Sequence, residues 1–312
     1  MSASSIEWTE VTWNPVTGCD RISIGCDNCY ALKMAKRLKV MGAAKYQTDG
    51  DPRTSGPGFG VAVHDGTMAE PLRWRSPRKV FVNSMSDIAH ARVSSAAQAR
   101  IWAVMALTPR HQYQILTKRP KHLANLLSSL GFYDQVKAAL WEVVEDFDGP
   151  IPVDDMNAAI RWVDPRERLK DAIPEPLPNV WLGTSIESDK YCWRADELRR
   201  TPAAIRFLSC EPLLGPLPSL DLTGLDWVIV GGESGPGFRP LDLDWVRDLR
   251  DRCLRDHVSL FFKQVGGARP KAGGRLLDGR TWNEFPRAAS SAIAPRHGSK
   301  SPIPATQPTH CH

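Results

Sequence analysis

Apolar and polar positions alternate along the chain in a repeated order, in which a short apolar run ends in polar residues and a longer amphipathic stretch follows. An apolar run of four or five residues bounded by polar residues is typical of a buried strand. Such runs occur at residues 79–83, 112–116, 180–184, 205–209, 227–230 and 259–262. Residues 6–13 alternate with a period of two and predict a further strand at the start of the chain.

The stretches between these runs have apolar residues at helical spacing. They predict helices over residues 30–41, 94–107, 120–130, 193–200 and 244–256. Pro120 suits the first position of its helix, where the missing N–H costs nothing. Strands that alternate with helices predict an α/β fold with a parallel sheet.

Two segments depart from this rhythm. Residues 46–79 are rich in glycine and proline, and we expect them to be ordered only against another part of the chain. Residues 131–178 predict two helices, over 132–147 and 156–169, before a proline-rich stretch. This helical insertion is too short to bury a core of its own, so we expect a lid or accessory element.

Composition is that of a globular protein, with 42% hydrophobic and 24% charged residues among 312. Residues 287–312, rich in alanine, serine and proline, predict a disordered tail and leave 1–286 as one domain. Three of the five net positive charges lie in that tail, which leaves +2 for residues 1–286. No apolar run is long enough to cross a membrane and no secretory signal is evident, so we expect a reducing cytoplasm.

A local basic strip surrounds Trp74 and consists of Arg73, Arg75, Arg78 and Lys79. Basic residues interleaved with an aromatic residue are able to contact nucleic acid phosphates. A solvated loop edge explains the same pattern. The sequence therefore leaves nucleic acid open as a partner.

The chemistry of the chain is concentrated in Cys19, Cys26 and Cys29, which follow the first predicted strand with the spacing C-x6-C-x2-C. Gly18 and Gly25 each precede a cysteine, where a loop that wraps an inorganic group needs backbone freedom. Three thiols within eleven residues therefore predict a metal site.

Three interpretations of this cysteine motif stay open. A structural zinc site needs four ligands, and a distant group such as His64 or His90 would have to complete it. Three thiolates on a [4Fe–4S] cluster would leave one iron free for a small-molecule ligand, which is a catalytic arrangement. Unmetallated thiols are the third interpretation. We favour the iron–sulfur cluster.

Both a doubly wound sheet and a parallel barrel satisfy the strand and helix order. Polar groups follow nearly every predicted strand, and in a barrel all of these ends face one shared mouth. We therefore expect a partial (β/α)6-type or near-complete parallel TIM-like barrel. Besides Cys19, Cys26 and Cys29, the groups concerned are Ser84, Asp87, Lys118, Arg119, Ser185, Glu187, Cys210, Glu211, Glu233, Lys263 and Gln264.

A cysteine trio after a first strand, followed by alternating strands and helices, resembles the radical S-adenosylmethionine superfamily. Longer strings resemble its phage- and prophage-associated three-cysteine branch, which has little assigned function. These strings are Trp13-Asn14-Pro15, Thr17-Gly18-Cys19, residues 81–87, 116–120, 210–216, 231–235 and 279–286. Outside the helical insertion the resemblance covers residues 6–286.

The resemblance implies a [4Fe–4S] cluster on the three cysteines, with S-adenosylmethionine bound to the fourth iron. Reduction by an external electron donor would cleave the cofactor to methionine and a 5′-deoxyadenosyl radical that abstracts hydrogen from a substrate. The chain departs from the superfamily in its first cysteine gap of six residues rather than three. The Gly-Gly-Glu string, which the superfamily has after its second strand, ends here at Glu233, near the sixth.

Candidate roles follow from the chemistry of each side chain. Asp87 is the candidate acceptor for the cofactor ammonium, and Lys118 or Arg119 for a carboxylate or phosphate. Tyr30 would pack over adenine, and Cys210 would donate hydrogen to a product radical. The remaining candidates for cofactor binding are Ser84, Ser185, Glu187, Glu211 and Glu233.

The sequence thus predicts a radical S-adenosylmethionine enzyme whose substrate is unidentified, with a nucleotide or nucleic acid as one option. The alternatives are an iron–sulfur protein that binds nucleic acid without turnover, and a zinc-dependent protein. The sequence predicts neither the bond attacked nor the oligomeric state.

Overall fold

A seven-stranded parallel sheet organises the computed structural model, which describes residues 4, 6–164, 173–269 and 271–286. Its strand order is β1-β4-β5-β6-β7-β8-β9, and every neighbouring pair is parallel. The strands are β1 (Val11–Trp13), β4 (Lys79–Val82), β5 (Gln112–Thr117), β6 (Val180–Ser185), β7 (Ile205–Cys210), β8 (Trp227–Gly231) and β9 (Ser259–Gln264). A separate antiparallel pair joins β2 (Val16–Thr17) to β3 (Ala62–Val63).

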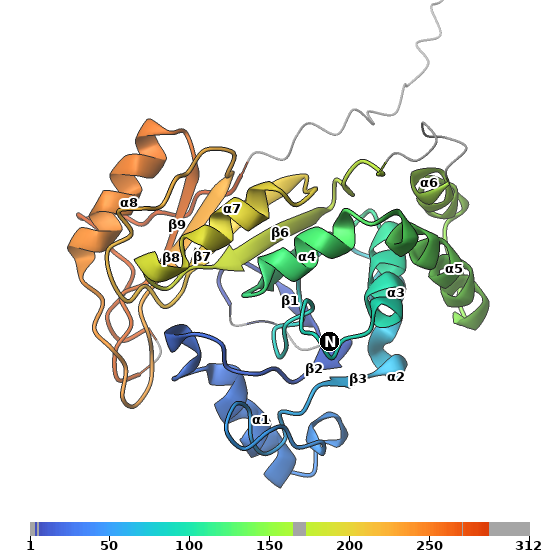
Figure 1. Cartoon of the computed structure of the whole chain (residues 1–312), viewed down its shortest axis with the longest axis horizontal. Helices are drawn as coiled ribbons and strands as arrows, with labels where there is room; N and C mark the ends of the chain where they lie inside the picture. The colour runs from blue at the N-terminus through green and yellow to red at the C-terminus, as the bar shows by residue number, and fades with distance from the viewer. Residues whose placement is uncertain (1–3, 5, 165–172, 270, 287–312) are drawn as a thin grey trace, which may run out of the picture.

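The sheet curls into a half-barrel and stays open (Figure 1). In the described part of the chain β1 and β9 are its two edges and do not pair with each other. The α/β class and the parallel order predicted from sequence are confirmed, and the barrel is partial rather than closed. Because every neighbouring pair of strands is parallel, all carboxyl ends lie along one edge of the sheet, which we call the carboxyl edge.

Helices follow most strands, as the sequence predicts. They are α1 (Tyr30–Val40), α2 (Asp65–Met68), α3 (Ser95–Ala106), α4 (Pro120–Leu127), α5 (Leu130–Asp146), α6 (Val153–Val163), α7 (Trp193–Arg199) and α8 (Leu243–Arg255). Short 3₁₀ helices lie at Ile24–Cys26, Ala44–Tyr46, Glu70–Arg73 and Asp189–Tyr191. The hydroxyl of Ser94 caps α3 by accepting a hydrogen bond from the Ala97 N–H.

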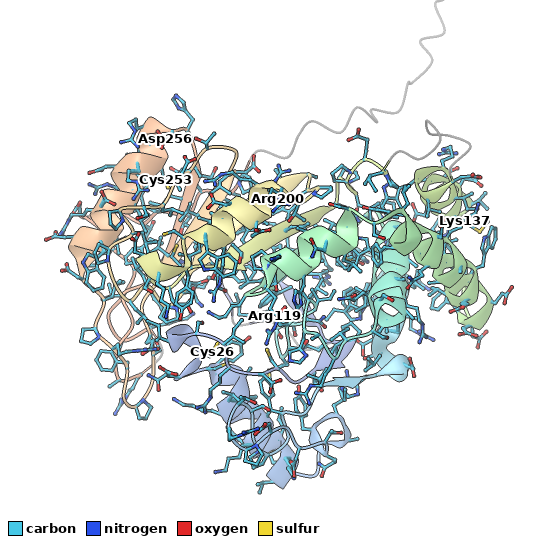
Figure 2. The ribbon with its side chains drawn as sticks, viewed as in Figure 1. Cys26, Arg119, Lys137, Arg200, Cys253 and Asp256 are labelled. Carbon is cyan, nitrogen blue, oxygen red and sulfur yellow. The ribbon has the colours of Figure 1, made fainter. Side chains whose placement is uncertain are left out.

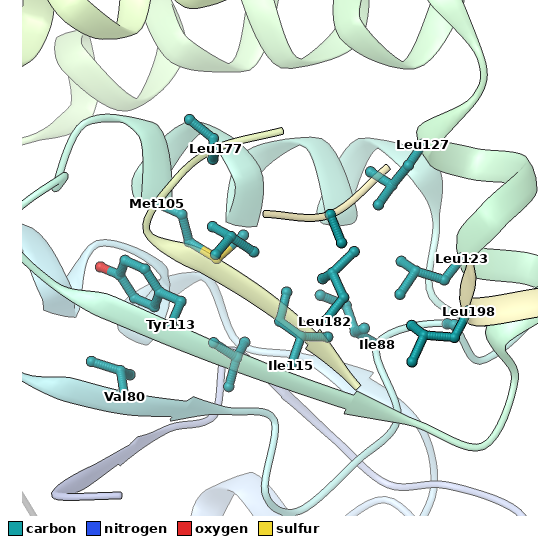
Figure 3. Close-up of a cluster of buried hydrophobic side chains, with 14 of the residues drawn as sticks. Val80, Ile88, Met105, Tyr113, Ile115, Leu123, Leu127, Leu177, Leu182 and Leu198 are labelled. Carbon is teal, nitrogen blue, oxygen red and sulfur yellow. The ribbon is translucent and has the colours of Figure 1, made fainter. Parts of the chain in front are cut away.

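The main core lies between the sheet and its helices. Side chains alternate along each strand, so Tyr113, Ile115 and Leu182 point to the helix layer (Figure 3). Met105 and Leu127 meet them there from α3 and the end of α4. The side chains of the sheet and of the helices are buried at this contact. Burial of their apolar surface holds the helices on the outer face of the sheet.

The opposite, inner face of the sheet holds an aromatic cluster near the amino ends of the strands. Trp227 is its centre and packs against Trp8, Trp181 and Phe285 with ring centroids 5.0 to 6.3 Å apart. Trp8 explains why β1 begins at Val11 and not at residue 6, as we expected. The segment before β1 turns inward to fill the half-barrel instead of extending the sheet.

The helical insertion forms part of the helix layer. Phe132 of α5 packs edge-on against Trp102 of α3 with centroids 5.6 Å apart, and α5 lies beside α3, away from α1 (Figure 1). Of the two expected roles, lid or accessory element, the packing of α5 on α3 fits the accessory element. The end of the helix expected over 156–169 and the tail expected to be disordered lie outside the described residues.

Within the described residues no helix has the length and apolar character needed to cross a membrane.

Candidate functional site

Residues 18–30, which we call the cysteine loop, lie beyond the carboxyl edge of the sheet. Gly18 begins the loop and donates its N–H to the Met85 carbonyl oxygen at 2.9 Å, just after β4. Its φ of +87° is in the left-handed region, and a Cβ there would lie 2.1 Å from the Gly60 oxygen. Only glycine fits at this position. The hydrogen bond from Gly18 to Met85 therefore joins the end of β2 to the carboxyl edge.

Arg119, just after β5, holds the first cysteine. Its Nη1 lies 3.4 Å from Cys19 Sγ and 2.9 Å from Asp87 Oδ2. Burial, and next the negative charge of Asp87, raise the pKa of the Cys19 thiol to about 12, although Arg119 opposes the shift. Cys19 should therefore be a neutral thiol, which would lose its proton when a metal ion binds the sulfur.

Glu187, just after β6, holds the middle of the cysteine loop. Its fully buried carboxylate accepts from the Gly25 N–H at 3.4 Å, from Lys118 Nζ at 3.2 Å and from Arg194 Nη1 at 2.9 Å. Burial alone would raise the pKa of Glu187, but the charges of Lys118 and Arg194 hold it below its usual value. A Cβ on Gly25 would lie 3.0 Å from the Glu187 carboxyl carbon, so the loop packs directly on this carboxylate.

Glu233, just after β8, holds the loop from the other side. Its Oε2 accepts from Asn28 Nδ2 at 2.9 Å and from the Arg239 N–H at 2.9 Å. Arg239 Nη2 in turn donates to the Ile24 carbonyl oxygen at 3.0 Å. Burial opposes ionisation, yet the hydrogen bonds from Arg239 and Asn28 keep the pKa of Glu233 lowered.

Asp20 ties the loop to the glycine-rich segment 46–79. Its carboxylate accepts from Thr54 Oγ1 at 2.7 Å and from Ser55 Oγ at 3.0 Å, and it contacts His90 Nε2 at 2.9 Å. The expectation that this segment is ordered against other parts of the chain is confirmed, and the cysteine loop is one of those parts, beside β2 and Arg110.

The three cysteines of the loop are partly buried. Cys26 raises the pKa of both Cys19 and Cys29 by electrostatic repulsion, after the larger effect of burial on each. Figure 2 shows Cys26 and Arg119 close to the carboxyl edge. Among the residues that the structure describes, no group of three His, Cys, Asp or Glu side chains is arranged to hold a metal ion.

The inner face of the sheet changes character toward the carboxyl edge. Ser185 and Ser209 are register partners on β6 and β7, and Gly231 ends β8. Lys263 Nζ and Glu211 Oε1 form an ion pair at 2.9 Å across Gly231, where a Cβ would lie 3.2 Å from that oxygen. Near the cysteine loop the inner face therefore carries small side chains and a charged pair, whereas near the amino ends of the strands it carries the aromatic cluster.

Other predicted site residues have structural partners. Asp87 accepts four hydrogen bonds, from the Ala89 and Lys118 N–H groups, Thr117 Oγ1 and Arg119 Nη1, so both its oxygens are used by the protein. The Tyr30 hydroxyl donates to the Ser84 carbonyl oxygen, and its ring is 54% exposed.

Cys210 lies on the wrong face of β7 for the proposed hydrogen donor. Side chains alternate along a strand, so Ser209 and Glu211 point to the inner face while Cys210 points to the helix layer. Its side chain has no exposed surface, and burial raises the pKa of the thiol well above its ordinary value. A hydrogen donor must touch its substrate, so we assign Cys210 to the core.

The basic strip at residues 73–79 lies at the opposite ends of the strands from the cysteine loop. Its last residue, Lys79, begins β4, whereas Met85 and Asp87 follow that strand at the carboxyl edge. Trp74 is buried in the core, and Arg73 stacks over Phe147 at 4.9 Å. The strip therefore borders the amino ends of the strands.

Sequence reasoning missed Asn28, Arg194 and Arg239, which hold the loop through Glu187 and Glu233. Arg194 lies on an amphipathic helix, where an arginine normally faces solvent, yet it is 1% exposed. The sequence carries no signal for such a contact.

The fold and the site together define an α/β half-barrel protein with a three-cysteine loop clamped at its carboxyl edge. A family model described as "Protein of unknown function (DUF5131)" matches residues 3–286, and the chain belongs to this family. No curated protein and no solved structure matches the chain.

Proposed function

We propose that this protein is a radical S-adenosylmethionine enzyme in which Cys19, Cys26 and Cys29 hold a [4Fe–4S] cluster. The observation that carries the proposal is the way in which strand ends hold the cysteine loop. Arg119, Glu187 and Glu233 reach it from β5, β6 and β8, through contacts to Cys19, Gly25 and Asn28 respectively. A loop built only for packing needs no such convergence of buried charges.

A single zinc ion would need a fourth ligand besides the three thiolates. His90, a candidate for that ligand, is engaged through Nε2 with Asp20 and through Nδ1 with the Arg92 N–H. Three thiolates on a four-iron cluster instead leave one iron for a small-molecule ligand, so the cluster needs no fourth protein ligand.

With the cluster in place, S-adenosylmethionine would supply the 5′-deoxyadenosyl radical that abstracts hydrogen. The chain's own contribution would be to bind and orient this cofactor on the inner face. Lys263 and Glu211 offer opposite charges 2.9 Å apart, which match the carboxylate and ammonium of an amino acid. Asp87, whose oxygens are already used, would act instead through Arg119 to position Cys19.

The test is cofactor cleavage without a substrate. Protein purified anaerobically and reconstituted with iron and sulfide is given dithionite and S-adenosylmethionine, and 5′-deoxyadenosine is measured. We expect release from the native chain and none from Cys26→Ala, while Cys253→Ala, a buried thiol of α8, retains it. Release that survives Cys26→Ala would refute the proposal.

The alternatives predict other results in the same preparation. A non-catalytic iron–sulfur protein would be brown and would release no 5′-deoxyadenosine. A zinc protein would be colourless and would carry zinc. No contact in the described residues favours either of them over the radical enzyme.

A further inference from the structure

The first helix presents an uncompensated basic face directly after the cysteine loop. Helix α1 has no acidic residue, and Lys33, Lys36 and Arg37 lie on one side of it because they are three or four positions apart. All three are exposed, and none makes an ion pair or a side-chain hydrogen bond within the described residues. Lys39 differs, since Asp49 Oδ2 lies 2.6 Å from its Nζ.

Exposed aromatic side chains border the same loop. Tyr30, at the start of α1, is 54% exposed, and Phe238 is 37% exposed. The loop that carries Phe238 contacts the cysteine loop, because Asn28 Nδ2 donates to the Gly237 oxygen at 3.1 Å. The two rings therefore belong to segments that meet at the cysteine loop.

The basic face is within reach of the cysteines. At about 1.5 Å of rise per residue, Lys33 lies about 6 Å along the helix axis from Cys29, and Arg37 lies about 12 Å from it. Successive nucleotides of one strand of B-form DNA are about 3.4 Å apart along the axis, and we take this spacing for a stacked single strand. A strand that lies along α1 would therefore reach the cysteine loop within about four nucleotides.

We propose that this surface binds single-stranded nucleic acid, whose phosphates contact Lys33, Lys36 and Arg37 and whose bases stack on Tyr30 and Phe238. The inference rests on the proposed function, for which it names the substrate class. A single strand is expected because a base in a duplex reaches an active site only after it is unpaired and extruded, at a cost of a few kcal/mol that a single strand avoids. Basic residues beside exposed rings are the usual means of binding such a strand.

A protein partner fits this surface less well. Lysine is depleted in protein interfaces relative to other surfaces, yet two of the three unpaired cations of α1 are lysines. The basic strip at residues 73–79 does not compete for the role, because it borders the amino ends of the strands.

The test is fluorescence anisotropy with a labelled oligothymidylate of about 20 nucleotides, longer than a single-strand site of about 4 to 16. The variant combines Lys33→Gln with Lys36→Gln, and the matched control combines Arg75→Gln with Arg78→Gln from the basic strip. Each phosphate contact contributes about −0.7 to the slope of log affinity against log salt. We expect the α1 variant to reduce that slope by about 1.4 and the affinity about 10-fold at low salt, and the control to change neither.

Three results would overturn the proposal: no binding by the native chain at low salt, equal losses in variant and control, or unchanged binding in the α1 variant. If that variant instead slows reduction of the cluster by an acidic redox protein, the surface belongs to a protein partner. The proposed function is judged separately by dithionite-driven release of 5′-deoxyadenosine. Binding without release refutes the radical enzyme alone, and release without binding refutes this inference alone.

Discussion

The link between Arg194 and the cysteine loop is the most informative contact to perturb. Arg194 Nη1 donates to Glu187 Oε2 at 2.9 Å and to the Ser185 oxygen at 2.8 Å, and both charged side chains are almost fully buried. Glu187 in turn accepts from the Gly25 N–H. Changes at either charge should therefore affect both folding and the cluster.

Glu187→Gln keeps the shape of the side chain and removes its charge, which leaves Arg194 buried without a counter-charge. Breaking a buried ion pair from one side costs about 3 to 5 kcal/mol, and the retained amide oxygen should keep the loss near the lower value. We expect the free energy of unfolding to fall by about 3 kcal/mol. The bound iron per chain should fall too. The amide oxygen should stay toward Lys118 and Arg194, so the NH2 group would face the Gly25 N–H and could not accept its hydrogen bond.

A double-mutant cycle separates the ion pair from general damage. Arg194→Met removes the cation, and Glu187 then keeps its contact with Lys118 Nζ at 3.2 Å. In urea denaturation the two changes should couple by about 1 to 3 kcal/mol, since residues in direct contact are not additive. Additive effects within about 0.5 kcal/mol, with iron content unchanged in both variants, would refute the reasoning.

Two further predictions concern stability. Gly18→Ala should cost more than about 2 kcal/mol and abolish iron binding, because its Cβ would lie 2.1 Å from a carbonyl oxygen at a φ of +87°. Gly42→Ala, at a φ of +74° with open space around it, should cost only about 1 kcal/mol in the same urea titration, and equal losses would contradict the steric argument. Burial lowers the pKa of His111 from 6.5 to about 4, so the unfolded chain binds its proton first as the pH falls. The free energy of unfolding should therefore decrease by up to about 3 kcal/mol between pH 6.5 and pH 4, and His111→Gln should reduce this dependence; the same urea midpoint shift in both chains would disprove it.

The sheet was predictable because most of its strands are short and mainly apolar, which is typical of buried parallel strands. β1 was predicted too long, because apolar residues occur on both sides of Thr9 and Glu10. Trp8 is three positions from Val11, so the alternation changes phase there, and Trp8 lies in the inner aromatic cluster whereas Val11 and Trp13 lie in the main core.

The candidate site was predictable only in its position. The topology places polar residues at strand ends along one edge, and Glu187 and Glu233 do lie there. Their partners were not predictable, because an arginine on a helix such as Arg194 is expected to face solvent, and Asn28 is neutral and distant in sequence from Glu233. The orientation of Cys210 was within reach, since strand periodicity already places it on the opposite face from Glu211.

The central claim is an iron–sulfur cluster with one iron left open by a three-cysteine loop. The most direct test is the electron paramagnetic resonance spectrum of the reduced, reconstituted protein before and after addition of S-adenosylmethionine. An open iron that binds the cofactor predicts a cluster signal that changes on addition and is absent in Cys26→Ala. A signal that the cofactor leaves unchanged, or a preparation that takes up no iron, would contradict the account.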